Sequence, residues 1–153
     1  MTKVEICAYS PALRPFFKTL NEEWLKKYFV VEPYDAALLE NCESEIINKG
    51  GNIFFAKLNG VVIGTYALLA PVNGCVELGK MAITAAFQGK GYGQQLLQHA
   101  INTAVSLGHK EMMLYSSRKL KNSIYLYRKF DFKEISHEDS PYKRGDIKML
   151  LKL

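Results

Sequence analysis

The sequence has few cysteines and histidines, and neither type occurs in a cluster. The three cysteines are far apart: Cys7, Cys42 and Cys75. The three histidines are equally scattered: His99, His109 and His137. Zinc sites and disulfide frameworks need these residues at short, recurring spacings, so the sequence predicts neither. Cys75 could act as a nucleophile, but no motif surrounds it, and we interpret it as a buried structural cysteine.

Long apolar runs are also missing. No stretch is long enough to cross a bilayer, and the start, MTKVEICAYS, lacks the basic region and apolar core of a signal peptide. We therefore expect a cytoplasmic protein with no membrane partner. With 153 residues, 48% of them hydrophobic and 23% charged, the chain matches a single globular domain over 1–153.

The basic charge of the chain is spread out and does not form one dense stripe. The net charge is +5, from 20 Lys and Arg against 15 Asp and Glu. Nucleic-acid binding is one interpretation of such a balance. The densest basic patch, 118–121, follows a phosphate-type turn and could equally face a small polyanionic cofactor. We therefore do not expect nucleic acid as the partner.

Apolar periodicity predicts one α/β domain with a mixed sheet. The expected strands cover 3–8, 52–58, 61–70, 75–84, 111–116, 132–135 and 146–153. The expected helices cover 12–28, 35–48, the segment leading to Gly108, and 122–130, with a polar loop at 137–145. Ser10-Pro11 predicts a helix entry, Asn59-Gly60 predicts a hairpin turn, and 71–74 predicts a further turn. The imperfect alternation at Gly79-Lys80 indicates a bulge or a strand that splays from its neighbour. His99 is expected to face solvent.

A glycine-rich turn followed by a helix dominates the middle of the chain. Residues 88–93 read QGKGYG, and the apolar residues of 96–104 recur at helical spacing. The start of such a helix presents backbone N–H groups without partners, which bind anions such as phosphate together with the helix dipole. Lys90 adds positive charge there. The segment predicts the site of a phosphate-bearing cofactor.

Two common phosphate-binding turns do not match this segment. A P-loop needs GxxxxGK followed by Ser or Thr, and no such run occurs. The dinucleotide-binding GxGxxG turn needs a glycine where this chain has Gln94. A third pattern, Gln/Arg-x-x-Gly-x-Gly/Ala, is met by Gln88, Gly91 and Gly93.

From residue 77 to the C-terminus, the sequence resembles the GNAT-type N-acetyltransferases. The matching segments are ELGKMAIT (77–84), the turn QGKGYG with its helix, and LYRKFDF (126–132), where the family usually has LYxxxGF. Asp131 replaces the glycine of that motif, and aspartate tolerates a left-handed φ better than most residues. The resemblance implies a single-domain GNAT fold: a mixed, mostly antiparallel sheet that is splayed at its middle strands, with helices on both faces.

The resemblance also implies acetyl-CoA as co-substrate, with no metal. The pyrophosphate would lie on the amides of 88–94, and the pantetheine arm would lie between the strands 75–84 and 111–116. The implied cofactor-binding residues are Met81, Ala82, Ile83, Gln88, Gly89, Lys90, Gly91, Tyr92, Gly93, Gln94 and Asn122. Asn122 lies nearer the tyrosine of the LYxxxGF motif than the asparagine of the family does.

The implied activity is transfer of an acetyl group from acetyl-CoA to a primary amine of a small molecule or peptide, by direct attack in a ternary complex. Tyr127 matches the family tyrosine that lies near the thioester sulfur, where it could protonate the departing thiolate; its alternative role is a core tyrosine. Glu77 occupies a position from which some members use a glutamate as base; the alternative is an ordinary strand carboxylate.

The resemblance implies that 16–34 and 136–144 shape the acceptor side. Four carboxylates there could attract a cationic amine or simply solvate a helix surface: Glu22, Glu23, Glu32 and Asp35. An alternative function is a catalytically silent, acyl-CoA-binding regulatory module. Exposed C-terminal strands are compatible with a homodimer.

Overall fold

The computed structural model describes residues 3–136 and 140–153. Seven strands are formed: β1 (Glu5–Ala8), β2 (Asn52–Leu58), β3 (Val61–Val72), β4 (Cys75–Ile83), β5 (Glu111–Ser116), β6 (Lys133–Ile135) and β7 (Ile147–Lys152). The α-helices are α1 (Arg14–Tyr28), α2 (Pro33–Glu40), α3 (Cys42–Glu45), α4 (Tyr92–Ser106) and α5 (Lys121–Lys129). Short 3₁₀ turns occupy Pro11–Leu13, Ile47–Lys49 and Ala85–Phe87. His137 and the start of the predicted 137–145 loop lie outside the described residues.

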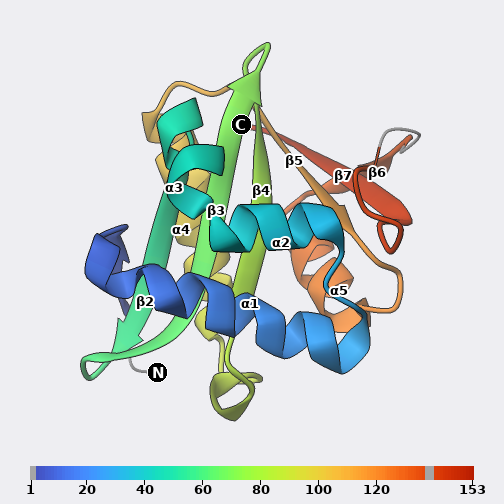
Figure 1. The fold of residues 1–153 in the computed structure, drawn as a ribbon. Helices are drawn as coiled ribbons and strands as arrows, with labels where there is room; N and C mark the ends of the chain where they lie inside the picture. Colours follow the sequence, from blue (N-terminus) through green and yellow to red (C-terminus); the bar gives the residue numbers. More distant parts are fainter. Residues whose placement is uncertain (1–2, 137–139) are drawn as a thin grey trace.

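The strands form one mixed sheet in the order β1-β2-β3-β4-β5-β7-β6. Neighbouring strands are antiparallel except β4 and β5, which are parallel and joined through α4. Helices α1, α2 and α3 cover one face of the sheet, and α4 lies on the other (Figure 1). The predicted α/β class with a mostly antiparallel sheet is confirmed.

Each face of the sheet has its own apolar core. On one side, Phe17 and Leu25 of α1 pack with Leu38 of α2 against the sheet. On the other side, Leu96 and Leu97 of α4 pack against the opposite face, with part of α5 at the margin. Both α1 and α4 carry their apolar residues at i, i+3 and i+4, which is why their boundaries could be predicted closely.

The predicted helix over 35–48 is wrong in two respects. It begins earlier, at Pro33, because proline has no N–H to lose in the first turn and its fixed φ suits that position. It is also interrupted at Asn41, whose φ of −123° and ψ of 43° end α2 before the short α3 begins. The predicted entry at Ser10-Pro11 forms only a 3₁₀ turn, since α1 starts at Arg14.

Two of the predicted turns are confirmed by their backbone angles. Asn59 and Gly60 have φ values of 50° and 78°, as the hairpin between β2 and β3 requires. Asp131, which follows the C-cap residue Phe130 of α5 and replaces the glycine of the motif, has a φ of 72°. The turn predicted at 71–74 is narrower, because β3 continues through Pro71 and only Asn73 and Gly74 turn the chain.

β4 carries the bulge that its sequence predicted. Ala67 pairs with Gly79 and Thr65 pairs with Ala82, so β4 has one extra residue between these pairs. Lys80 lies in the bulge with a φ of 51°. Val76 and Leu78 pack in the core beneath α4, whereas the Lys80 ammonium reaches Asp35 of α2 on the opposite face. The bulge therefore breaks the alternation of side chains that a regular strand would keep.

β4 and β5 pair over only part of their length. Their ladder joins Cys75, Val76 and Glu77 to Glu111, Met112 and Met113 and ends there. β4 nevertheless continues to Ile83, and β5 continues to Ser116. The predicted splay at the middle of the sheet is thus present, and it begins at Glu77.

Candidate active site

A cleft of about 700 Å³ opens where β4 and β5 separate. Its walls come from residues 77–83 of β4, from the end of β5, from the turn before α4 and from the first half of α5. Trp24 and Tyr28 of α1 close one end of the cleft together with Tyr142 and Arg144. The cleft thus extends from the glycine-rich turn to the surface between α1 and the β6–β7 connection.

Most of the predicted site residues line this single cleft. They are Glu77, Met81, Ala82, Ile83, Gln88, Gly89, Gly91, Gly93, Gln94, Asn122 and Tyr127. Lys90 and Tyr92 do not line it. The Tyr92 side chain is buried with its ring centroid 6.3 Å from that of Phe87, and the Lys90 ammonium lies 5.7 Å from the Phe87 ring. The buried Tyr92 side chain is thus part of the core, whereas the exposed Lys90 lies beside the turn.

The turn before α4 has the geometry of an anion site. Gly91 is the N-cap of α4 with a φ of 85°, and Gly89 has a φ of 74°, values that glycine adopts without strain. No side chain caps the helix start, so its first N–H groups point into the turn. The Gln88 side chain donates a hydrogen bond of 2.8 Å to the Ile83 carbonyl, which holds the turn against the end of β4.

Tyr127 lies on α5 and borders the cleft from the side of β5. Its ring packs edge to face on Phe132, with 5.8 Å between centroids. Burial raises the pKa of Tyr127 to about 12, so the phenol remains protonated throughout the physiological pH range. A phenol in this state can donate a proton or a hydrogen bond to a group in the cleft.

Glu77 lies at the point where the two strands part. It pairs with Met113 in the last rung of the β4–β5 ladder and lines the cleft. Burial and the charge of Glu77 together raise the pKa values of Tyr34 and Tyr142, with burial the larger cause. The Glu77 carboxylate therefore lies near aromatic groups, at the end of the cleft that Tyr142 and Arg144 close.

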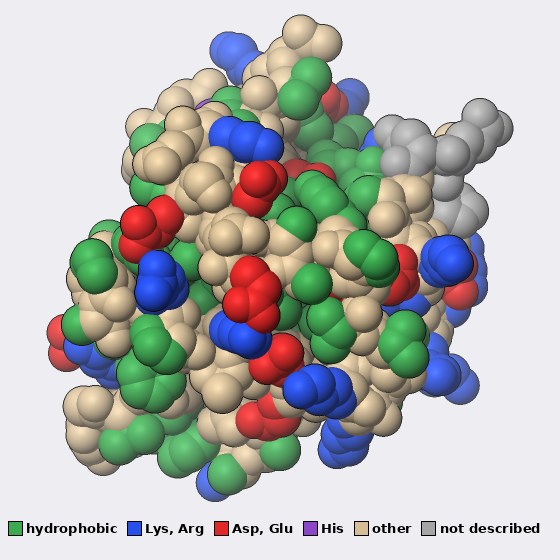
Figure 2. All heavy atoms as spheres, in the orientation of Figure 1, with side chains coloured by type: hydrophobic (Ala, Val, Ile, Leu, Met, Phe, Trp, Pro, Cys, Tyr) green, Lys and Arg blue, Asp and Glu red, His purple; other side chains and the backbone are tan. Residues whose placement is uncertain are grey.

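The four carboxylates suggested for amine attraction all have partners within the protein. Glu22 pairs with Lys26 on the outer surface of α1, the face on which Figure 2 shows acidic and basic side chains intermingled. Glu23 accepts a hydrogen bond of 2.7 Å from the Ala85 backbone N–H. Glu32 and Asp35 bind Arg144. Glu23, Glu32 and Asp35 thus join segments around the cleft, whereas Glu22 forms a pair within α1.

Sequence reasoning missed a charged cluster beside the cleft. Asp35 is fully buried and binds both Lys80 and Arg144. Burial alone would raise the pKa of Asp35, but the hydrogen bonds from Arg144 and the charge of Lys80 hold it below its usual value. The one signal in the sequence was the lysine at the position of the predicted bulge, in a strand that is apolar apart from this residue and Glu77.

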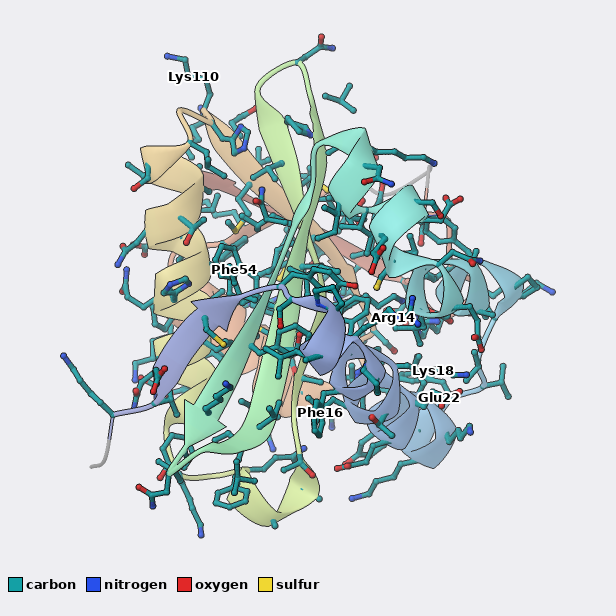
Figure 3. The ribbon with its side chains drawn as sticks, turned by 60° about the vertical axis from the view of Figure 1, so that its left-hand side comes forward. Arg14, Phe16, Lys18, Glu22, Phe54 and Lys110 are labelled. Carbon is teal, nitrogen blue, oxygen red and sulfur yellow. The ribbon has the colours of Figure 1, made fainter. Side chains whose placement is uncertain are left out.

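The prediction that His99 faces solvent is wrong. The Tyr66 hydroxyl lies 2.8 Å from Nδ1 of His99, and the Phe54 ring lies 5.1 Å from the imidazole. Figure 3 shows the labelled Phe54 between the sheet and α4. The apolar face of α4 is wide enough to bring His99 partly into the interface with β3. There its contact with Tyr66 links the helix to the sheet.

Burial lowers the pKa of His99, and we expect a pH-dependent stability from it. The unfolded chain takes up the proton near pH 6.5, whereas the native state resists it. The free energy of unfolding should therefore fall as pH drops through 6.5 towards the native pKa, because the unfolded state then binds more protons. Urea unfolding at pH 7.5 and 5.5 measures this. His99→Gln should reduce the difference in unfolding free energy between the two pH values. If the difference is not reduced, other titratable groups cause it.

The cysteines show no sign of catalysis. Cys42 is buried, whereas Cys7 and Cys75 are partly exposed, so the expected full burial of Cys75 is wrong. Burial and the neighbouring Glu111 raise the pKa of the Cys75 thiol, with burial the larger cause. The thiol is therefore neutral and a poor nucleophile. Within 3–136 and 140–153, no three or more histidine, cysteine or acidic side chains are grouped to hold a metal ion.

Comparison with protein families identifies the chain. The model of the acetyltransferase (GNAT) family matches residues 16–132, which is well over half of the sequence. The chain belongs to the GNAT acetyltransferase family. A similar protein is the uncharacterized N-acetyltransferase YvbK of Bacillus subtilis, which is 29% identical over 105 residues, covering 67% of this chain and 68% of YvbK.

Solved structures share the fold of this GNAT protein. A GNAT-family acetyltransferase from Staphylococcus aureus Mu50 aligns with a TM-score of 0.87 and 22% identity, covering 98% of this chain and 99% of the other. The PaiA N-acetyltransferase from Thermoplasma acidophilum, solved in complex with coenzyme A, aligns with a TM-score of 0.77 and 20% identity, covering 99% and 100%. At these identities the likeness establishes the fold. No helix in the described part of this GNAT chain is both long and apolar enough to span a membrane.

Proposed function

We propose that this GNAT protein acts as a single domain over residues 1–153 and transfers an acetyl group from acetyl-CoA to a primary amine of a small molecule or peptide. The observation that carries the proposal is the early end of the β4–β5 ladder at Glu77 and Met113, which leaves a cleft between two diverging strands. Membership of the acetyltransferase family supports the reaction class. The coenzyme A bound to the Thermoplasma relative supports the choice of co-substrate.

The cleft fits an extended thioester cofactor. Beyond Glu77, β4 no longer pairs with β5, so the edge of Met81, Ala82 and Ile83 that faces the cleft can pair with the amides of a pantetheine arm. The uncapped start of α4 suits a pyrophosphate. Lys119 and Lys121, which line the same cleft, add positive charge for the phosphates.

Bound acetyl-CoA would supply the activated acetyl group, and the protein would supply orientation and proton transfer. In a ternary complex the amine nitrogen attacks the thioester carbon directly, the carbon–sulfur bond breaks, the amine loses a proton and the thiolate gains one. Tyr127 would give the proton to the sulfur, and Glu77 would accept the amine proton, directly or through water. Backbone N–H groups near Met81–Ile83 would polarise the carbonyl.

The role of Glu77 predicts a change in pH dependence. Replacing Glu77 with glutamine should lower kcat/KM by roughly 10²-fold, the lower end of the range for a general base. It should also remove the acidic limb of the pH profile, because that limb reports protonation of the base in the free enzyme. Glu111→Gln, at the other end of the strand pairing, is the matched control. An unchanged acidic limb in Glu77→Gln would exclude this role.

An amine panel tests the proposed function itself. Release of free coenzyme A thiol should depend on both acetyl-CoA and an amine, and mass spectrometry should find the amine heavier by one acetyl group. Small polyamines, amino acids and peptides with free N-termini belong in the panel. Tight coenzyme A binding without turnover on any amine would instead favour an acyl-CoA-binding regulatory module.

A further inference from the structure

Four charged side chains meet at the acceptor end of the cleft with very little exposure to solvent. The side chains of Lys80 and Asp35 are 2% and 0% exposed, and those of Arg144 and Glu32 are 10% and 12% exposed. Lys80 pairs with Asp35. Arg144 donates two hydrogen bonds of 2.7 Å to the two oxygens of Asp35, and its Nη1 lies 3.4 Å from Glu32. The positive charges of Lys80 and Arg144 thus lie against the negative charges of Asp35 and Glu32.

The cluster joins three segments that are far apart in the sequence. Lys80 comes from the bulge of β4, and Glu32 and Asp35 come from the start of α2. Arg144 comes from the connection between β6 and β7. Glu32 also accepts hydrogen bonds from the backbone N–H groups of Lys143 and Arg144, at 2.9 and 3.4 Å. The cluster therefore fixes the backbone at Lys143 and Arg144 as well as the Arg144 side chain.

Aromatic rings surround the two cations and extend into the cleft. The Arg144 guanidinium lies 4.2 Å from the centroid of the Tyr142 ring and 5.5 Å from that of Trp24. The Lys80 ammonium lies 4.6 Å from the Tyr142 ring. Trp24, Tyr142 and Arg144 all line the cleft with Glu77. The cluster thus determines where the aromatic rings that share the cleft with the proposed base are held.

Stability alone is a poor explanation for this arrangement. Burying charges costs several kcal/mol per ion, and well-packed apolar residues are often as stabilising as a buried ion pair or more so. The bidentate Arg144–Asp35 bond, by contrast, fixes one orientation of the guanidinium and of the turn that carries it. The cluster therefore serves to fix the positions of side chains at the acceptor end of the cleft.

We propose that Arg144 is a positioning residue for the amine. Its two hydrogen bonds to Asp35 and its ring contacts hold Tyr142 and Trp24 in place, and these two rings orient the amine towards Glu77. This inference rests on the proposed acetyl transfer. It assigns Arg144 to the amine half of the cleft and not to the coenzyme A half.

Arg144→Lys tests this role, because lysine keeps the charge but cannot form two parallel bonds or stack flat on a ring. The KM for the amine should rise about tenfold, which corresponds to the loss of roughly one hydrogen bond. The kcat per folded molecule and the Kd of coenzyme A should each change by less than about threefold, a difference of under about 1 kcal/mol. Arg14→Lys is the matched control, since Arg14 at the start of α1 (Figure 3) forms an exposed pair with Glu43 of α3 and does not line the cleft.

Trp24 gives a second readout that needs no activity, because it is the only tryptophan in the chain. Its emission should shift to longer wavelength in Arg144→Lys and stay unchanged in Arg14→Lys. If Arg144→Lys does not fold, Glu32→Gln serves instead. This variant weakens the hold on the Lys143 and Arg144 backbone and should raise the amine KM in the same direction, by a smaller factor.

The outcomes separate this inference from the proposed function. A wild-type protein that transfers acetyl groups while Arg144→Lys keeps its amine KM overturns the positioning role alone. A variant that loses only stability, with amine KM and Trp24 emission unchanged, overturns it too. A wild-type protein that neither binds coenzyme A nor acetylates any amine overturns the proposed function, and the positioning role falls with it.

Discussion

Replacing Tyr127 with phenylalanine should lower kcat by about 100-fold. A positioned general acid contributes roughly 10² to 10⁴ in rate. We expect an effect at the lower end of this range, because a thiol with a pKa of about 8.5 already leaves readily as the thiolate. The hydroxyl is protonated at neutral pH, since burial raises the pKa of Tyr127 to about 12. Removing it should therefore remove the proton donor but leave the ring packed on Phe132.

Steady-state kinetics and a coenzyme A titration check this expectation together. The Kd of coenzyme A should stay close to that of the wild type, because phenylalanine fills the same space. Tyr9→Phe is the matched control, since it removes a hydroxyl that bonds to Glu43 outside the cleft. Full turnover in Tyr127→Phe would make Tyr127 a core tyrosine and remove it from the reaction.

Replacing Asp35 with alanine should cost about 3–5 kcal/mol of unfolding free energy. The change leaves Lys80 and Arg144 buried, with Glu32 still paired to Arg144 and the charge of Glu77 still acting on Lys80. Removing one partner of a buried pair has a cost of this size. Asp35 also accepts a hydrogen bond of 2.9 Å from the Glu32 backbone N–H at the start of α2. Such a loss is a large part of the roughly 5–15 kcal/mol that stabilises a typical protein.

Thermal unfolding measures the cost, and a shift of about 6–20 °C in the midpoint is expected at about 2–4 °C per kcal/mol. Glu40→Ala is the matched control. It breaks the Lys18–Glu40 pair, whose side chains are 39% and 54% exposed, and should move the midpoint little. Equal midpoints for the two variants would show that the buried cluster contributes no more than a surface pair.

The glycine-rich turn, α4 and the bulge of β4 could be predicted from the sequence because they depend on short, local patterns. Glycines at 89 and 91 determine the backbone of the turn, and the apolar spacing of α4 determines which face packs on the sheet. The bulge at Gly79-Lys80 was also visible, because it interrupts the alternation of a strand. Each of these features is encoded within a few consecutive residues.

The charged cluster at the other end of the cleft could not be predicted, because it depends on contacts between distant segments. Asp35 and Arg144 are separated by more than one hundred positions. No local sequence pattern around either residue indicates that the two interact. Asp35 was expected to face either an amine or solvent, yet it is fully buried. The prediction for His99 was wrong for a similar reason. Its neighbours on α4 are polar and gave no indication of the contact with Tyr66 on β3.

Thermal unfolding with increasing coenzyme A tests the central claim most directly. At one hundred times the Kd, the ligand should add about 2.7 kcal/mol of stability, which is roughly 5–11 °C in the midpoint. Gly89→Ala should lose most of this shift, and Gly108→Ala should keep it. Both glycines have a positive φ, 74° and 84°, with open space around an added Cβ, so only the first substitution should affect the cofactor. A midpoint that does not move at millimolar coenzyme A would contradict the assignment of the cleft between β4 and β5.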